Sequence, residues 1–153
     1  PSGVLGWLAS GRPGSRLYGR RSRRRSLTRI TTGDCYSGGQ LQTLGDVRHR
    51  CLVSEFAVPV DDRFQIISQL PAGQILVDRD YLSHGRSERF MLFEITAGRP
   101  RSRKQKQQFY RRLTKELQQS AGVDPNDVLI IITFNSSDDW SFSQGLMLSE
   151  VSL

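Results

Sequence analysis

The chain has 153 residues, 37% of them hydrophobic, and it carries 22 lysines and arginines against 15 aspartates and glutamates. This length suits one domain with a packed core, and no stretch approaches the ~20 apolar residues of a membrane-spanning helix. Two cysteines are too few for a disulfide scaffold, and the two histidines form no metal-ligand cluster. We therefore expect a soluble, cytoplasmic protein that binds neither metal nor membrane.

The positive charge is concentrated near the amino terminus. Residues 1–33 contain eight arginines and no acidic residue, whereas residues 34–153 hold 14 basic and 15 acidic residues. Residues 1–25 are also rich in glycine and serine, so we expect an arginine-rich, disordered extension. Three roles are open for it: a phosphate-binding tail, an organelle transit peptide, or an extension without selected function, which we favour. Residues 26–153 form a nearly neutral domain, for which we expect no binding to nucleic acid.

An internal repeat of 65 residues divides this domain into halves at about residues 26–70 and 89–134. Each half has the pattern of a strand, a helix and a second strand. The coincidences that mark the repeat pair Leu27 with Leu92, Ile30 with Ile95, Gly33 with Gly98, and Asp62 with Asp127.

A capping box opens the predicted helix of each half. Ser37 and Gln40 form the first box, and Ser102 and Gln105 form the second. Apolar residues at helical spacing follow both boxes, and Gly122 is a suitable stop for the second helix. The strands that we expect after the two helices are Phe64–Leu70 and Val128–Phe134.

The two units predict an α/β fold. Strand–helix–strand units with right-handed crossovers give a four-stranded sheet with both helices on one face. Val128–Ile132 is apolar at every position, which indicates burial on both faces of the sheet. Because two helices cover only one face, we expect the other face to pack against further copies of the chain in an obligate oligomer.

Arg99 and Arg101 precede the second predicted helix, where the repeat departs from its own pattern. Two guanidinium groups beside a helix N-terminus favour a carboxylate or phosphate. The alternative is a solvated basic first turn, because Arg103 and Lys104 follow. From the residues alone we weigh these two interpretations evenly.

Two further features are candidates for a functional role, a pair of aromatic residues and an aspartate. Trp140 and Phe142 alternate in a polar segment after the last predicted strand and would form one wall of an apolar pocket, or complete the core or a subunit interface. Asp62 lies where the first helix leads into its strand, and its repeat partner Asp127 suggests a turn role. In both cases the structural interpretation is favoured from these residues alone.

From about residue 41 to residue 145, the chain resembles the tautomerase superfamily, and in particular its malonate semialdehyde decarboxylase branch. The resemblance implies the fold derived above, assembled as a homotrimer. It implies tautomerisation or decarboxylation of a small oxo acid without a cofactor, as an isomerase or a lyase. The matching stretches are Val58–Gln65, Gly85–Ser87, Arg99–Ser102 and Asp139–Phe142.

The resemblance also implies roles for individual residues. Arg99 and Arg101 would hold the substrate carboxylate and stabilise enolate charge. Asp62 would assist decarboxylation or activate water, and Trp140 and Phe142 would form the hydrophobic wall of the pocket.

The catalytic base that the resemblance implies is an amino-terminal proline. An α-amino group has a reference pKa of ~7.7–8.0, which suits a general base near neutral pH. Pro1 stands first in this chain, but the family's proline position falls near Ser26. Either Pro1 is the catalytic amine and the intervening residues loop out, or the amine is absent and the chain is a non-catalytic oligomeric member.

Overall fold

The computed structural model describes residues 25–151. The predicted order of strand, helix and strand in each half is confirmed, and β2 begins one residue later than predicted. Pro1 and all of the expected extension except Arg25 lie outside the described residues. The elements are β1 (Ser26–Gly33), α1 (Gly38–Phe56), β2 (Gln65–Leu70), β3 (Met91–Ala97), α2 (Arg103–Ala121), η2 (Pro125–Asp127), β4 (Val128–Phe134), η3 (Ser137–Asp139) and α3 (Leu148–Val151).

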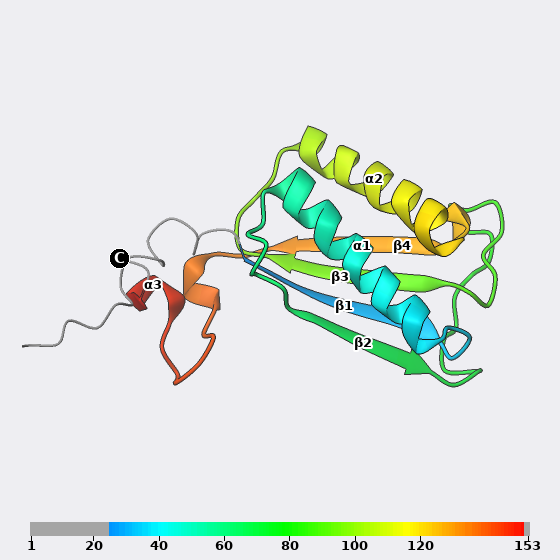
Figure 1. Cartoon of the computed structure of the whole chain (residues 1–153), viewed down its shortest axis with the longest axis horizontal. Helices are drawn as coiled ribbons and strands as arrows, with labels where there is room; N and C mark the ends of the chain where they lie inside the picture. The colour runs from blue at the N-terminus through cyan, green and yellow to red at the C-terminus, as the bar shows by residue number, and fades with distance from the viewer. Residues whose placement is uncertain (1–24, 152–153) are drawn as a thin grey trace, which may run out of the picture.

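The four strands form one mixed sheet in the order β2-β1-β3-β4. β1 pairs with β2, and β3 with β4, in parallel, whereas the central β1–β3 pair is antiparallel. Helices α1 and α2 lie side by side on one face of this sheet (Figure 1). The predicted fold class is therefore confirmed. Because the two units run in opposite directions, the start of β1 and β2 meets the end of β3 and β4.

Both predicted capping boxes are present. Ser37 accepts a hydrogen bond from the Gln40 amide at 3.2 Å, and Ser102 accepts one from the Gln105 amide at 3.1 Å. Each glutamine side chain returns the bond to the serine backbone, and such caps are worth about 1 kcal/mol. Gly122 ends α2 with a φ of +64°, a left-handed conformation that glycine adopts without strain.

The core lies between the helices and the sheet. Phe56 of α1 stacks on Phe109 of α2 with ring centroids 4.7 Å apart. The opposite face of the sheet is left open in the single chain, where Ile66 is 46% and Ile131 is 50% exposed. No helix within residues 25–151 is both long and apolar enough to span a bilayer. Fully buried core side chains include Ile30, Leu44, Leu52, Phe93, Leu113 and Leu117.

Candidate functional site

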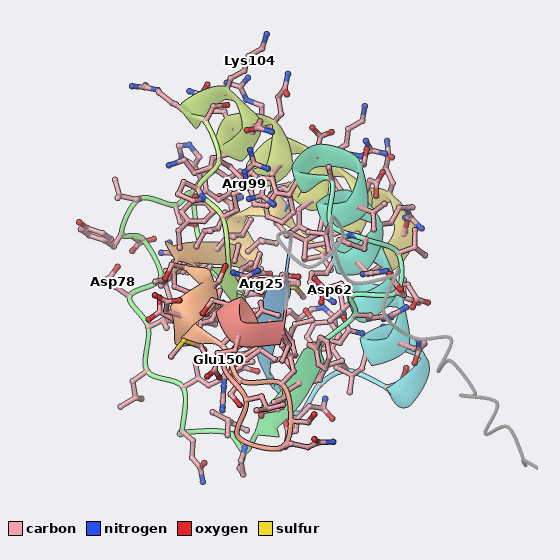
Figure 2. The ribbon with its side chains drawn as sticks, turned by 90° about the vertical axis from the view of Figure 1, so that its left-hand side faces the viewer. Arg25, Asp62, Asp78, Arg99, Lys104 and Glu150 are labelled. Atoms are coloured by element: carbon pink, nitrogen blue, oxygen red, sulfur yellow. The ribbon has the colours of Figure 1, made fainter. Side chains whose placement is uncertain are left out.

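The predicted site residues that the structure describes lie at one end of the sheet, where β1 and β2 begin and β3 and β4 end. Asp62 precedes β2, and Arg99 follows β3. Trp140 and Phe142 come after β4 and the short helix η3. This end is on the left in Figure 1 and faces the viewer in Figure 2, where η3 and α3 lie in front of the sheet.

Asp62 is the acidic group of this end. Its Oδ2 accepts a hydrogen bond of 3.0 Å from the backbone N–H of Ser26, the first residue of β1. Burial raises the pKa of this carboxyl to about 6, although the Ser26 amide and the charge of Arg48 act in the opposite direction. A carboxyl group with such a pKa is able to take up and release a proton near neutral pH.

Arg25 fills the space beside Asp62, a position that the sequence analysis placed in the extension. The residue is 4% exposed, and its Nη2 donates a 2.9 Å hydrogen bond to Ser137 Oγ. The guanidinium carbon lies 6.0 Å from the ring centroid of Trp140. Burial lowers the pKa of Arg25, while the nearby Asp62 opposes that change.

Gly98, directly after β3, leaves room for the Arg25 side chain because it has no Cβ. A Cβ at position 98 would lie 2.5 Å from Arg25 Nε, so only glycine allows the side chain to pass. The Gly98 N–H also donates a 2.9 Å hydrogen bond to the Arg25 carbonyl oxygen. The residue before β1 is therefore held by both its backbone and its side chain.

The predicted pair of aromatic residues is stacked at this end of the sheet and lies outside the core cluster. Trp140 stacks on Phe142 with centroids 5.3 Å apart, and Phe142 contacts Phe64 at 5.5 Å. Trp140 Nε1 donates to Asn135 Oδ1 at 2.5 Å, which fixes the indole. Phe64 was not singled out from the sequence, although it directly precedes β2.

The two predicted arginines differ in their surroundings. Arg99 is exposed, and Figure 2 shows it at the same end as Arg25 and Asp62, displaced towards the helices. Arg101 donates two hydrogen bonds to the carbonyl oxygen of Phe56, at 2.9 and 3.2 Å, and another to the Arg99 carbonyl. Its guanidinium group also lies over the Phe56 ring. Arg101 thus ties the start of α2 to the end of α1.

Arg48 of α1 is a buried cation that the sequence analysis overlooked. It is fully buried and its Nη1 donates a 2.9 Å hydrogen bond to Thr28 Oγ1 in β1. Within residues 25–151, its Nε and Nη2 have no hydrogen-bond partner. Burial lowers its pKa to about 10. The signal was present in the sequence, because Arg48 stands four residues from both Leu44 and Leu52 on the core-facing stripe.

Comparisons with known proteins agree with the fold. The family described as "Tautomerase enzyme" matches residues 62–143. "Probable tautomerase YrdN" of Bacillus subtilis (strain 168) is 34% identical over 106 residues, which cover 69% of this chain and 81% of that protein. A crystal structure of malonate semialdehyde decarboxylase has 35% identity and a TM-score of 0.73, covering 78% of this chain and 92% of that one. A fused 4-OT symmetric trimer, 16% identical, shares the fold with a TM-score of 0.66 over 80% of this chain and 96% of that one.

Proposed function

The chain belongs to the tautomerase superfamily, in its malonate semialdehyde decarboxylase-like branch, and from this premise we propose that it moves protons on a small oxo acid without a cofactor. The reaction is either the interconversion of enol and keto forms or the loss of carbon dioxide from a 3-oxo acid. The observation that carries the proposal is Asp62, a half-buried carboxyl with a pKa raised to about 6, among cationic and aromatic side chains.

Each side chain has a role in this proposal. Arg99, exposed at the edge of the site, binds the substrate carboxylate. Arg101 remains a second candidate for that contact, although its hydrogen bonds to Phe56 favour a positioning role. Trp140 and Phe142 shield one side of the substrate from water, which strengthens the electrostatic interactions of the enolate.

The chemistry needs a group that accepts or donates one proton at carbon. In tautomerisation, a base removes a proton from one atom, the electron pair of that bond moves into the enol system, and a proton is added at the other end. In decarboxylation, the electrons of the broken carbon–carbon bond form an enolate, which then takes up a proton. Asp62 activates water or exchanges the proton. The amine Pro1 remains a prediction, and it lies outside the described residues.

We also propose that the chain assembles as a homotrimer through the open face of its sheet. Ile66 of β2 and Ile131 of β4 expose about half of their surface on the single chain. The strand register places Arg29 and Glu94 between these two isoleucines, and exposed apolar side chains at the two edges of a sheet are stabilised when another copy covers them.

A non-catalytic role is the second candidate, because Arg25 occupies the space beside Asp62 where a substrate would bind. A protein that has lost turnover would keep the fold, the exposed Arg99 and the assembly. Ligand binding without turnover would be its signature.

The test is an activity assay on two probes. The enol–keto conversion of phenylpyruvate is followed by ultraviolet absorbance, and the decarboxylation of malonate semialdehyde by release of carbon dioxide. We expect turnover of at least one probe, with a large loss in Asp62→Asn and weaker binding in Arg99→Ala. Binding of either acid without turnover, lost in Arg99→Ala, would favour the non-catalytic candidate.

A further inference from the structure

We propose that the working amine of this chain is the α-amino group of Ser26, exposed by hydrolysis of the Arg25–Ser26 peptide bond, and that Arg25 keeps the site closed until then. The inference rests on the proposed function, which needs a group that accepts or donates a proton at carbon. It assigns a catalytic amine to Ser26, near which the family's proline position falls, and a processing site to the peptide bond before it.

The position of the Ser26 nitrogen supports this assignment. The Ser26 nitrogen lies 3.0 Å from Asp62 Oδ2 at the centre of the candidate site. In the intact chain this nitrogen belongs to a peptide group and has no basic lone pair. After hydrolysis it becomes a primary amine with a reference pKa of ~7.7–8.0. Burial favours the neutral amine, whereas Asp62 favours the ammonium form, so the two influences on this pKa oppose each other.

The volume that the Arg25 side chain occupies also supports this assignment. Arg25 packs between Gly98, Ser137 and Trp140 and contributes its charge to the surroundings of Asp62. When residue 25 leaves, the volume of an arginine side chain opens next to the new amine. The contacts that Arg25 gives up, a hydroxyl group, a backbone N–H and the face of an indole, suit a small polar acid.

Several buried polar atoms near Ser26 have no hydrogen-bond partner among the described residues. Ser26 is fully buried, and within residues 25–151 its Oγ has no hydrogen-bond partner. Two nitrogen atoms of the buried Arg48 are also without partners in that part of the chain. Buried polar groups are nearly always paired. Their presence under the start of β1 indicates that a ligand or water completes this site.

The sequence before Ser26 fits the processing step. Residues 20–25 read Arg-Arg-Ser-Arg-Arg-Arg, the kind of site that an endopeptidase specific for clustered basic residues recognises. Hydrolysis consumes one water molecule and leaves a carboxylate on Arg25 and an amine on Ser26. Arg25 and Ser26 are both buried in the folded chain. Cleavage therefore has to occur before Arg25 docks against Gly98.

The experiment compares four chains: the full chain, a chain that begins at Arg25, a chain that begins at Ser26, and the Ser26 chain with Ser26→Pro. All elements from β1 to α3 lie within the shortest of them, and circular dichroism with size measurement verifies that each one folds. The Arg25 chain is the matched control, because it differs by one residue yet keeps the guanidinium group in the site. With phenylpyruvate and malonate semialdehyde as probes, we expect kcat/KM of the Ser26 chain to exceed that of both longer chains by about 10²-fold or more.

Periodate identifies the amine directly. It oxidises the adjacent amino and hydroxyl groups of an amino-terminal serine to an aldehyde and so destroys the base. We expect it to abolish the activity of the Ser26 chain. The Ser26→Pro chain has a secondary amine without that hydroxyl group, so its activity should survive the same treatment.

The results separate the inference from the proposed function. Equal activity of the full chain and the Ser26 chain, or activity only in the Ser26→Pro chain, would overturn the inference and leave the function intact. No turnover by any folded chain would contradict the proposed function itself. Processing is tested by intact mass after expression of the full chain with an endopeptidase specific for clustered basic residues. We expect a product that begins at Ser26, absent in Arg25→Ala; uncleaved chain would contradict the step.

Discussion

Each half of the molecule places an aspartate before its second strand, and the two aspartates have different surroundings. Asp127, which is 3% exposed, accepts hydrogen bonds from the Ser87 N–H at 2.6 Å and the Ser87 Oγ at 2.7 Å, just before β3. Within residues 25–151, Asp62 accepts one side-chain hydrogen bond, from the Ser26 N–H at the start of β1. Burial raises the pKa of Asp62 to about 6. The same position of the repeat therefore closes a turn in one half and leaves a titratable carboxyl in the other.

The two aspartates differ because different segments of the chain surround them. Asp127 is enclosed by the loop before β3, which supplies both of its donors. Asp62 faces the end of the sheet where the chain continues from β4 into the segment with Trp140 and Phe142. The same position of the duplicated unit thus closes a turn in the second half, and in the first half it places a carboxyl at the end of the sheet that carries the candidate site.

The largest expected effect separates the two aspartates by activity. In whichever form of the chain turns over the probes, Asp62→Asn should lower kcat by about 10²-fold, because an amide neither accepts nor supplies the proton. Asp127→Asn should leave kcat of the folded protein near its original value. Steady-state kinetics on samples matched by circular dichroism measures both. Equal losses in the two variants would mean that Asp62 acts only through the fold.

Stability should show the reverse order. Asp127→Ala removes both acceptors of Ser87, and we expect it to lower the free energy of unfolding by about 2 kcal/mol. Asp62→Ala removes one hydrogen bond but also a carboxylate that burial disfavours at neutral pH, so its effect should be small. Urea denaturation at pH 7 measures the difference. A larger loss for Asp62→Ala would show that its hydrogen bond to Ser26 outweighs the cost of burying its charge.

Most of the fold was accessible from the sequence because it follows local rules. The capping boxes at Ser37 and Ser102 and the helical spacing of apolar residues predict both units. The site was accessible only in part, since Asp62 and Ser26 meet through the β1–β2 register, 36 positions apart. Arg25 was missed because a run of arginines reads as an extension, and Arg48 because a charged residue is usually assigned to the surface.

The raised pKa of Asp62 predicts a dependence of stability on pH. Its folded-state pKa of about 6 exceeds the ordinary value of 3.8, so between these values the folded chain binds more protons than the unfolded chain. The contribution of Asp62 to stability should therefore fall as pH rises from about 4 to 6, by on the order of 1–2 kcal/mol once the shift is discounted for solvent screening of a half-buried group. Unfolding of the wild type and of Asp62→Asn is measured at each pH, and the difference between the two isolates this residue. A constant difference would contradict the raised pKa.

The smallest expected effect concerns the residues just before α1 and α2, which make different contacts in the two halves. Before α1, the Tyr36 hydroxyl donates to the Arg89 carbonyl at 2.6 Å, and before α2, Arg101 donates to the Phe56 carbonyl. Both contacts tie one half to the other. Directly after its first strand, the second half carries the exposed cation Arg99. Arg99→Ala should raise KM about tenfold, the loss of one charge-assisted hydrogen bond, without changing stability.

Arg101→Ala is the matched control for that assignment. It removes both donors of the Phe56 carbonyl, and we expect a loss of about 1 kcal/mol in the free energy of unfolding. KM and urea denaturation are measured on both variants. A higher KM in Arg101→Ala with unchanged stability would move substrate binding to Arg101 and leave Arg99 as part of a solvated helix start. In that case the starts of the two helices would differ only in how the helices pack, because the first half has no arginine at the position that corresponds to Arg101.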